Sequence, residues 1–216
     1  MGCGEGSKTI EFVKNFKFKK AYGVDISKFA IDLAKKRYPH ITFSSGDIEK
    51  LQYADNFFDV VITNFVMEHT LKPQKIFKEV YRVLRNYGYF IVICPNYGAP
   101  NRCSPPFNGS RIKKLVRGFI SDFNLLSNGL HWNYVTPLSK KNNKHISDYD
   151  TTVEPYLLNT VRFCKKLGFK IVEYSSVWEQ DIPTNTRHKL FRKLGTIGVF
   201  PFKYWGPQHY LVMQKL

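Results

Sequence analysis

The feature that most constrains the fold is an alternation of helix-like and strand-like patterns through the first hundred residues. Residues 58–63 and 89–93 are almost continuously apolar, as strands buried on both faces of a parallel sheet usually are. Between them, residues 73–84 place Ile76 and Val80 four positions apart, at helical spacing. Strands that alternate with helices in this way predict an α/β domain with a mostly parallel sheet.

The other predicted elements extend this alternation to both ends of the chain. Further helices are predicted at residues 7–16, between Ser27 and Pro39, and at 111–119, 152–167 and 186–194. Further strands are predicted at residues 21–26, 41–43, 169–174 and 209–215. We expect the core-facing side chains of the first two helices to be Ile10, Val13 and Phe16, then Phe29, Ala30, Leu33 and Ala34.

The composition suits one globular domain with an unusual charge. The chain of 216 residues carries a net charge of +16, of which residues 101–146 hold +7 and residues 185–216 hold +6. These two segments favour either an anionic partner or an ordinary solvated surface. No apolar stretch is long enough to span a membrane, and the N-terminus lacks a secretory pattern, so we expect a cytoplasmic protein. The four cysteines form no CxxC pair, and we expect neither a zinc site, nor any other metal, nor a disulfide.

A glycine-rich turn opens the chain. Gly2, Gly4 and Gly6 alternate just before the first predicted helix, where backbone can approach a ligand closely and free N–H groups favour an anion. Asp25 follows about 20 residues later, at the end of the next predicted strand, where a carboxylate can accept hydrogen bonds from ribose hydroxyls. Together, these features predict a cofactor that contains a nucleoside.

Four further segments extend the pattern. They are residues 45–48 (SGDI), 57–61 (FFDVV), 64–69 (NFVMEH) and 84–88 (LRNYG). The whole series resembles the class I S-adenosylmethionine-dependent methyltransferases, in the small-molecule group that includes the type 11 methyltransferases. The resemblance covers residues 1–95 and returns at residues 163–173. It implies a Rossmann-like, doubly wound, mostly parallel sheet with an antiparallel last strand, and S-adenosylmethionine as cofactor.

The resemblance also implies a role for individual residues. The glycine turn would face the methionine part of the cofactor, and Asp25 would hold the ribose. The remaining cofactor contacts would be Ile26 against the adenine, Asp47 and Ile48 at its amino group and ring edge, and Asn64 at the methionyl region. Glu68 and His69 would lie near the substrate mouth, and His69 is the candidate catalytic residue. Simpler roles stay open for the polar ones: Asp25 and Asp47 suit turns or helix caps, and His69 suits a cap or a surface position.

The family pattern normally begins with an apolar strand that ends in an acid two positions before the first glycine. No such residues precede Gly2 here, so we expect the first strand of the sheet to be missing from the start of this chain. We predict a cofactor-binding core at residues 1–94 and an insertion or lid at 95–150. Residues 151–216 would complete the same domain.

The predicted function is S-adenosylmethionine-dependent methyl transfer to a small-molecule or lipid- or sugar-linked acceptor. His69, His131 and Asp148 all remain candidates for a general base. The aromatic side chains of the insertion either line an acceptor pocket or form a small core of the lid; they are Phe107, Phe123, Trp132 and Tyr134.

Two other functions stay open. One is a non-catalytic module that binds RNA or an anionic membrane, with nucleic acid the less favoured because no RNA-binding motif is present. The basic segment 186–194, followed by aromatic residues, would suit peripheral contact with the inner membrane surface, or else a crossover packed on the sheet. The other is a dinucleotide-dependent oxidoreductase, although Ser7 stands where its third glycine is expected.

Overall fold

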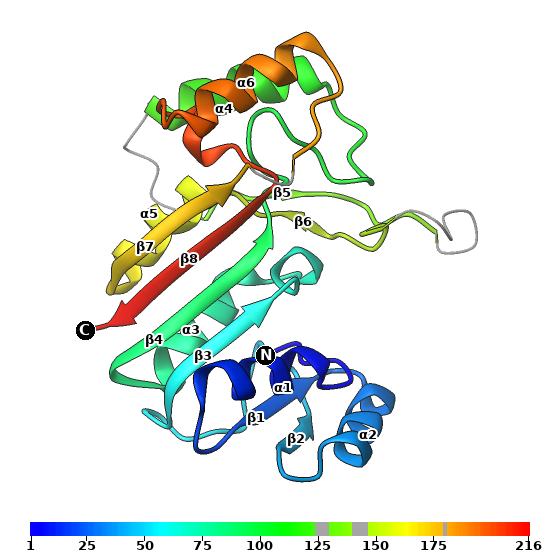
Figure 1. The fold of residues 1–216 in the computed structure, drawn as a ribbon, viewed down its shortest axis with the longest axis vertical. Helices are drawn as coiled ribbons and strands as arrows, with labels where there is room; N and C mark the ends of the chain where they lie inside the picture. Colours follow the sequence, from blue (N-terminus) through cyan, green and yellow to red (C-terminus); the bar gives the residue numbers. More distant parts are fainter. Residues whose placement is uncertain (124–129, 140–146, 179–180) are drawn as a thin grey trace.

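A computed structural model describes residues 1–123, 130–139, 147–178 and 181–216. At its centre is a four-stranded sheet in the order β3-β4-β8-β7 (Figure 1). Its strands are β3 (Phe58–Asn64), β4 (Leu84–Pro95), β7 (Phe169–Val177) and β8 (Gln208–Lys215). β3 and β4 are parallel, and β8 runs antiparallel to both of its neighbours. The α/β fold and the antiparallel last strand are therefore confirmed.

Two helices cover one face of this sheet. α3 (Pro73–Val83) and α5 (Leu157–Leu167) lie behind the strands in Figure 1. Phe77 of α3 packs edge-on against both Phe90 of β4 and Phe163 of α5, with ring centroids 5.8 Å apart in each case. The main hydrophobic core therefore lies between these helices and the sheet, as the apolar periodicity of residues 73–84 predicts.

A second, two-stranded parallel sheet carries the start of the chain. It pairs β1 (Tyr22–Asp25) with β2 (Thr42–Ser45), next to α1 (Ser7–Phe16) and α2 (Lys28–Arg37). Its small core is built on Ile31, Ala34, Ile41 and Phe43. Two predicted core residues are wrong, because Phe16 and Phe29 are 61% and 76% exposed. The buried stripe of α2 instead runs through Ile31 and Ala34, which are three positions apart.

A cavity of about 940 Å³ separates the two sheets. β1 and β3 form its walls and are not paired with each other. The chain start closes one end, since the Met1 ammonium donates to Ile62 O of β3 at 2.8 Å, and Cys3 N donates to Val24 O of β1 at 3.1 Å. Residues 1–3 therefore bridge the two sheets.

The predicted insertion at 95–150 contains regular structure. α4 (Arg111–Phe123) is longer than predicted, and β5 (Asn133–Tyr134) pairs antiparallel with β6 (Val153–Glu154). The predicted helix at 152–167 is therefore wrong at its start. Pro155 disfavours helical backbone at Glu154, which joins β6, and α5 begins only at Leu157. Part of the insertion, with Lys140, Lys141 and Lys144 of the basic segment, lies outside the described residues.

The last part of the chain adds a helix above the sheet. α6 (Thr186–Thr196) begins as predicted, and Asn185 caps it by accepting a hydrogen bond from His188 N at 2.9 Å. A short 3-10 helix, η3 (Phe202–Tyr204), then leads into β8. In the residues that the structure describes, no helix is long and apolar enough to cross a membrane. The same residues contain no group of three or more metal-binding side chains.

Candidate cofactor and acceptor site

The predicted cofactor residues lie at the ends of the first strands. Asp25 ends β1, directly beside Ser45 at the end of β2, and Gly46 N donates to Asp25 O at 3.0 Å. Asn64 ends β3 and lines the large cavity together with Gly2 and Gly4. The carboxyl ends of strands are where open α/β sheets bind ligands. The glycine turn and Asn64 therefore meet at this cavity, whereas the side chains of Asp25 and Ile26 lie outside its lining.

The glycine turn has a backbone that other residues adopt only with strain. Gly2, Gly4 and Gly6 have φ angles of 62°, 50° and 88°, all in the left-handed region. A Cβ on Gly2 would lie 2.2 Å from Val66 Cγ2, whereas a Cβ on Gly4 would meet nothing within 4 Å. The turn is therefore tightly packed at Gly2 and open at Gly4, which leaves backbone accessible to a ligand.

Asp25 holds the glycine turn in place. Its Oδ2 accepts from Gly4 N at 2.8 Å, and its Oδ1 accepts from Ser27 N at 2.9 Å. Each carboxylate oxygen can accept a second hydrogen bond, so these contacts leave capacity for ribose hydroxyls. The neighbouring Ile26 side chain is 80% exposed and free to cover a ring. This acceptor beside an open glycine turn fits a nucleoside-bearing cofactor.

Asp47 and Ile48, the other residues predicted to hold the adenine, have different surroundings. Asp47 is exposed, and its Oδ1 accepts from Glu49 N at 2.8 Å, which is the turn-forming role that the sequence left open. Ile48 packs against the main core. Neither residue lines the large cavity, whereas Gly2, Gly4 and Asn64 do.

His69 lies in an acidic setting. It ends a short 3-10 helix, η1 (Met67–His69), which follows β3. Its Nε2 is 3.7 Å from Glu68 Oε1, and its Nδ1 is 3.4 Å from Asp150 Oδ1. The His69 side chain is 32% exposed, so it can meet an acceptor while a carboxyl group stands on either side of it.

Glu68 is the unusual member of this group. Its side chain is fully buried, and neither carboxyl oxygen accepts a hydrogen bond from another residue of the described chain. Burial, with smaller contributions from Asp148 and Asp150, raises the pKa of Glu68 to about 8. Perturbed carboxyl groups of this kind concentrate at functional sites. The sequence placed Glu68 near the substrate mouth but gave it no role.

The other two candidate bases differ in their surroundings. Asp148 accepts a hydrogen bond from Tyr97 OH and lies close enough to Glu68 to raise its pKa. His131 is exposed, and its backbone N–H donates to Asn159 Oδ1 at 2.6 Å. Of the candidates, the structure therefore gathers His69 and Asp148 around Glu68.

The four aromatic residues of the insertion do not form one pocket. Trp132 is buried in the main core, where its Nε1 donates to Thr160 Oγ1 at 3.2 Å. Tyr134 is 66% exposed, and its hydroxyl donates to Leu71 O. Phe107 lies beneath the Lys114 ammonium, and Phe123 packs against Phe200. The expectation of a shared acceptor pocket or lid core is therefore wrong for this set.

Comparison with known proteins identifies the N-terminal part. Residues 1–92 match the family model of the methyltransferase domain. The match covers the glycine turn, β1 to β3 and most of β4, and it leaves residues 93–216 outside the family model. A probable S-adenosylmethionine-dependent methyltransferase of Mycolicibacterium smegmatis is 32% identical over 113 residues, which is 50% of this chain and 42% of that protein. A ubiquinone/menaquinone biosynthesis C-methyltransferase of Bdellovibrio bacteriovorus is 36% identical over 94 residues, which is 42% of this chain and 40% of that protein.

Solved structures extend the likeness of the methyltransferase domain to the whole chain. A putative methyltransferase of Haloferax volcanii, in complex with the Trm112 activator, matches with a TM-score of 0.61 and 16% identity over 99% of this chain and 78% of that one. An S-adenosylmethionine-dependent methyltransferase of Mesorhizobium loti matches with a TM-score of 0.58 and 15% identity over 99% of this chain and 88% of that one. At this identity the likeness concerns the fold. The chain spans less than half the length of the first curated relatives that it matches.

Proposed function

We propose that this protein is a methyltransferase that uses S-adenosylmethionine to methylate a small-molecule or lipid-linked acceptor. The observation that supports the proposal is the hydrogen bond between Gly4 N and Asp25 Oδ2, which ties the glycine turn to the acid at the end of β1 that would hold the ribose. The matching methyltransferase domain covers both residues. Relatives with the same domain are named as S-adenosylmethionine-dependent and quinone-biosynthesis methyltransferases.

The chain's own residues divide the work of holding the cofactor. The open turn at Gly4 would offer backbone to the methionine part, and the spare lone pairs of Asp25 would accept from the ribose. Ile26 would cover the adenine, Asp47 and Ile48 would hold its edge, and Asn64 would contact the methionyl region. When bound, S-adenosylmethionine supplies an electrophilic methyl group.

His69 then serves as the general base. An acceptor hydroxyl, amine or acidic carbon loses its proton as it is methylated, and the unprotonated ring nitrogen of His69 takes that proton. Asp150, 3.4 Å from His69 Nδ1, stabilises the imidazolium that results. Glu68, 3.7 Å from Nε2, adds to this only where it is ionised, above about pH 8. Positioning of the acceptor supplies the larger part of the rate, at about 7–11 kcal/mol, because the methyl donor is already reactive.

Removing the ribose-binding carboxylate should weaken cofactor binding. We expect Asp25→Ala to raise the dissociation constant of S-adenosylmethionine by about 5- to 150-fold. The ribose hydroxyls of the bound cofactor would lose the carboxylate that accepts from them, at a cost of about 1–3 kcal/mol. Isothermal titration calorimetry with the purified chain measures the constant. Circular dichroism shows whether the variant keeps its fold.

Asp32→Ala provides the matched control. Asp32 is an exposed acid of α2, so this change removes the same charge outside the glycine turn. The control should bind like the parent chain. An unchanged dissociation constant in Asp25→Ala, or tighter binding of a nicotinamide dinucleotide than of S-adenosylmethionine, would contradict the proposed function.

A further inference from the structure

α4 exposes a continuous apolar stripe. Its members recur at helical spacing and are all solvent-exposed: Ile112, Val116, Phe119, Ile120 and Phe123. Ile112 and Ile120 are 70% and 63% exposed. The opposite side of the helix faces the protein, since Lys114, Gly118 and Asp122 contact buried or backbone groups there. Water therefore meets an apolar surface that the described residues leave largely uncovered, of a kind that commonly marks an interaction site.

Cations flank this stripe. Exposed basic side chains lie on both helices, and they are Arg111, Lys113 and Arg117 of α4 with Arg187, Lys189 and Lys193 of α6. α6 contains no acid, and the one acid of α4, Asp122, is buried. Leu190 of α6 is 52% exposed among these cations. The surface therefore combines exposed hydrocarbon with positive charge that no exposed acid on either helix offsets.

The two helices form one surface, which we call the α4–α6 platform, made of the exposed side chains of residues 111–123 and 186–196. Phe119 of α4 and Phe191 of α6 both pack against Trp205, at 6.1 and 5.6 Å between ring centroids. Between the helices lies a cavity of about 280 Å³ lined only by apolar and aromatic residues, among them Leu115 and Ile120. The platform lies at the end of the molecule opposite α2 (Figure 1).

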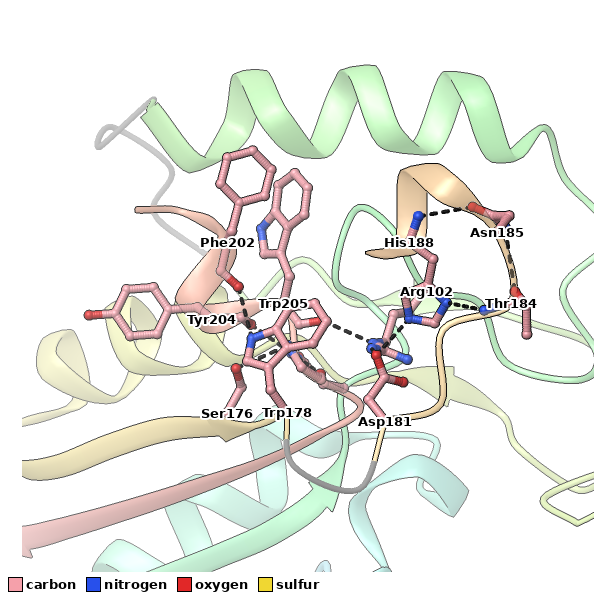
Figure 2. Close-up of polar contacts among 12 residues, drawn as sticks. Arg102, Ser176, Trp178, Asp181, Thr184, Asn185, His188, Phe202, Tyr204 and Trp205 are labelled. Atoms are coloured by element: carbon pink, nitrogen blue, oxygen red, sulfur yellow. Dashed lines mark hydrogen bonds and ion pairs between the residues drawn. The ribbon is translucent and has the colours of Figure 1, made fainter. Parts of the chain in front are cut away.

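Polar contacts beneath the platform hold it rigid (Figure 2). Asp181 pairs with Arg102 at 2.9 Å and with His188 of α6 at 2.6 Å. Arg102 also donates to Trp205 O at 2.9 Å. α6 is therefore fixed to the loop after β4 and to the aromatic residues below α4. A rigid surface loses little conformational freedom when it docks.

We propose that the α4–α6 platform binds the surface of an anionic phospholipid bilayer. An amphipathic surface with exposed aliphatic and aromatic side chains and flanking Lys and Arg suits the headgroup region, where the apolar groups enter the acyl boundary and the cations meet lipid phosphates. Exposed Ile and Val favour hydrocarbon over nucleic acid, whose bases stack on aromatic rings and whose phosphates need only the cations. The platform acts independently of methyl transfer and would hold the protein beside membrane-borne molecules.

Vesicle sedimentation tests the proposal. The probes are phosphatidylcholine vesicles with and without phosphatidylserine, at about 50 mM and at physiological salt. We expect the parent chain to bind the anionic vesicles in preference, and more weakly as salt rises. The double change Arg187→Gln and Lys189→Gln should weaken binding about 30-fold. The double change Ile112→Ser and Ile120→Ser should weaken it about tenfold or more.

The matched control is the pair Lys35→Gln and Lys36→Gln, which removes the same charge from exposed positions of α2 at the far end of the molecule. This control should bind vesicles like the parent chain, and thermal unfolding should show that all three variants fold. Failure to bind anionic vesicles, equal binding to neutral ones, or an equal loss in the α2 control would overturn the proposal. So would a dimer of the parent chain that the isoleucine changes dissociate, or tighter binding to single-stranded RNA that the same changes weaken.

Discussion

Lys114→Met should destabilise the fold by about 3–5 kcal/mol, because it leaves a buried carboxylate without its cation. Lys114 Nζ lies 2.6 Å from Glu154 Oε2 and donates to Tyr97 O at 2.7 Å. The Glu154 side chain is fully buried, and its remaining contacts are neutral donors from Ser104 and Asn133. The pair joins α4, β6 and the loop after β4, so its loss loosens the whole insertion. Urea unfolding measures the change.

Lys113→Met is the control, because Lys113 is the exposed neighbour on the same helix and its change should stay within about 0.5 kcal/mol. Adding Glu154→Gln to Lys114→Met removes the unpaired charge and should restore a large part of the lost stability. A Lys114→Met variant that is as stable as Lys113→Met would show that the pair does not hold the insertion.

The parallel strands β3 and β4 were predictable because each contains a nearly continuous apolar run. Residues 58–63 and 89–93 sit within β3 and β4 as predicted, and the last strand runs antiparallel between β4 and β7. An apolar run of this length favours a buried strand whatever its neighbours are, so the local sequence is enough to predict the strand. The start of β4 at Leu84 was not predicted, because its pairing with Phe58 is a long-range contact that the helical spacing of residues 73–84 conceals.

Other errors arose where tertiary contacts decide between equivalent patterns. Phe29 and Ile31 both suit an apolar stripe on α2, and only the packing against β2 buries Ile31 and exposes Phe29. Val153 and Glu154 read as the first turn of a helix, yet they pair with Asn133 and Tyr134. Neither partner is detectable from sequence, because a two-residue strand has no periodicity.

The candidate site also contains features that the sequence predicts and features that only the structure shows. The glycine turn and Asp25 were predictable, since their spacing reflects local turn geometry and the end of one strand. The raised pKa of Glu68, about 8, was not predictable, because burial causes it together with Asp148 and Asp150, which are distant in sequence. The same distant segment is joined to Glu68 by the hydrogen bond from Thr152 N to the backbone carbonyl of Glu68. The α4 stripe was missed for a related reason: only the structure shows that nothing in the described chain covers it.

Replacing the proposed base should have the largest effect on catalysis. We expect His69→Gln to lower turnover by about 10²- to 10⁴-fold for an acceptor that loses a proton on methylation, with cofactor affinity unchanged. Release of S-adenosylhomocysteine measures turnover, with phenols, hydroxyquinones and lipid-linked sugars as acceptors. His131→Gln serves as the control because His131 is exposed outside the acidic group. Full turnover in His69→Gln with any accepted substrate would exclude His69 as the base.

The pH dependence separates the role of Glu68 from that of His69. Because burial raises the pKa of Glu68 to about 8, its carboxyl group is mostly protonated at pH 7 and charged above pH 8. Glu68→Gln should therefore resemble the parent chain at pH 7 and lose turnover relative to it above pH 8, where only the parent gains a carboxylate 3.7 Å from His69 Nε2.

The folded state also holds the Glu68 proton more tightly than the unfolded chain does, so the stability that the neutral group contributes is lost as pH rises through about 8. The free energy of unfolding should change less between pH 6 and pH 9 in Glu68→Gln than in the parent chain. An equal change in both would show that Glu68 does not have the raised pKa.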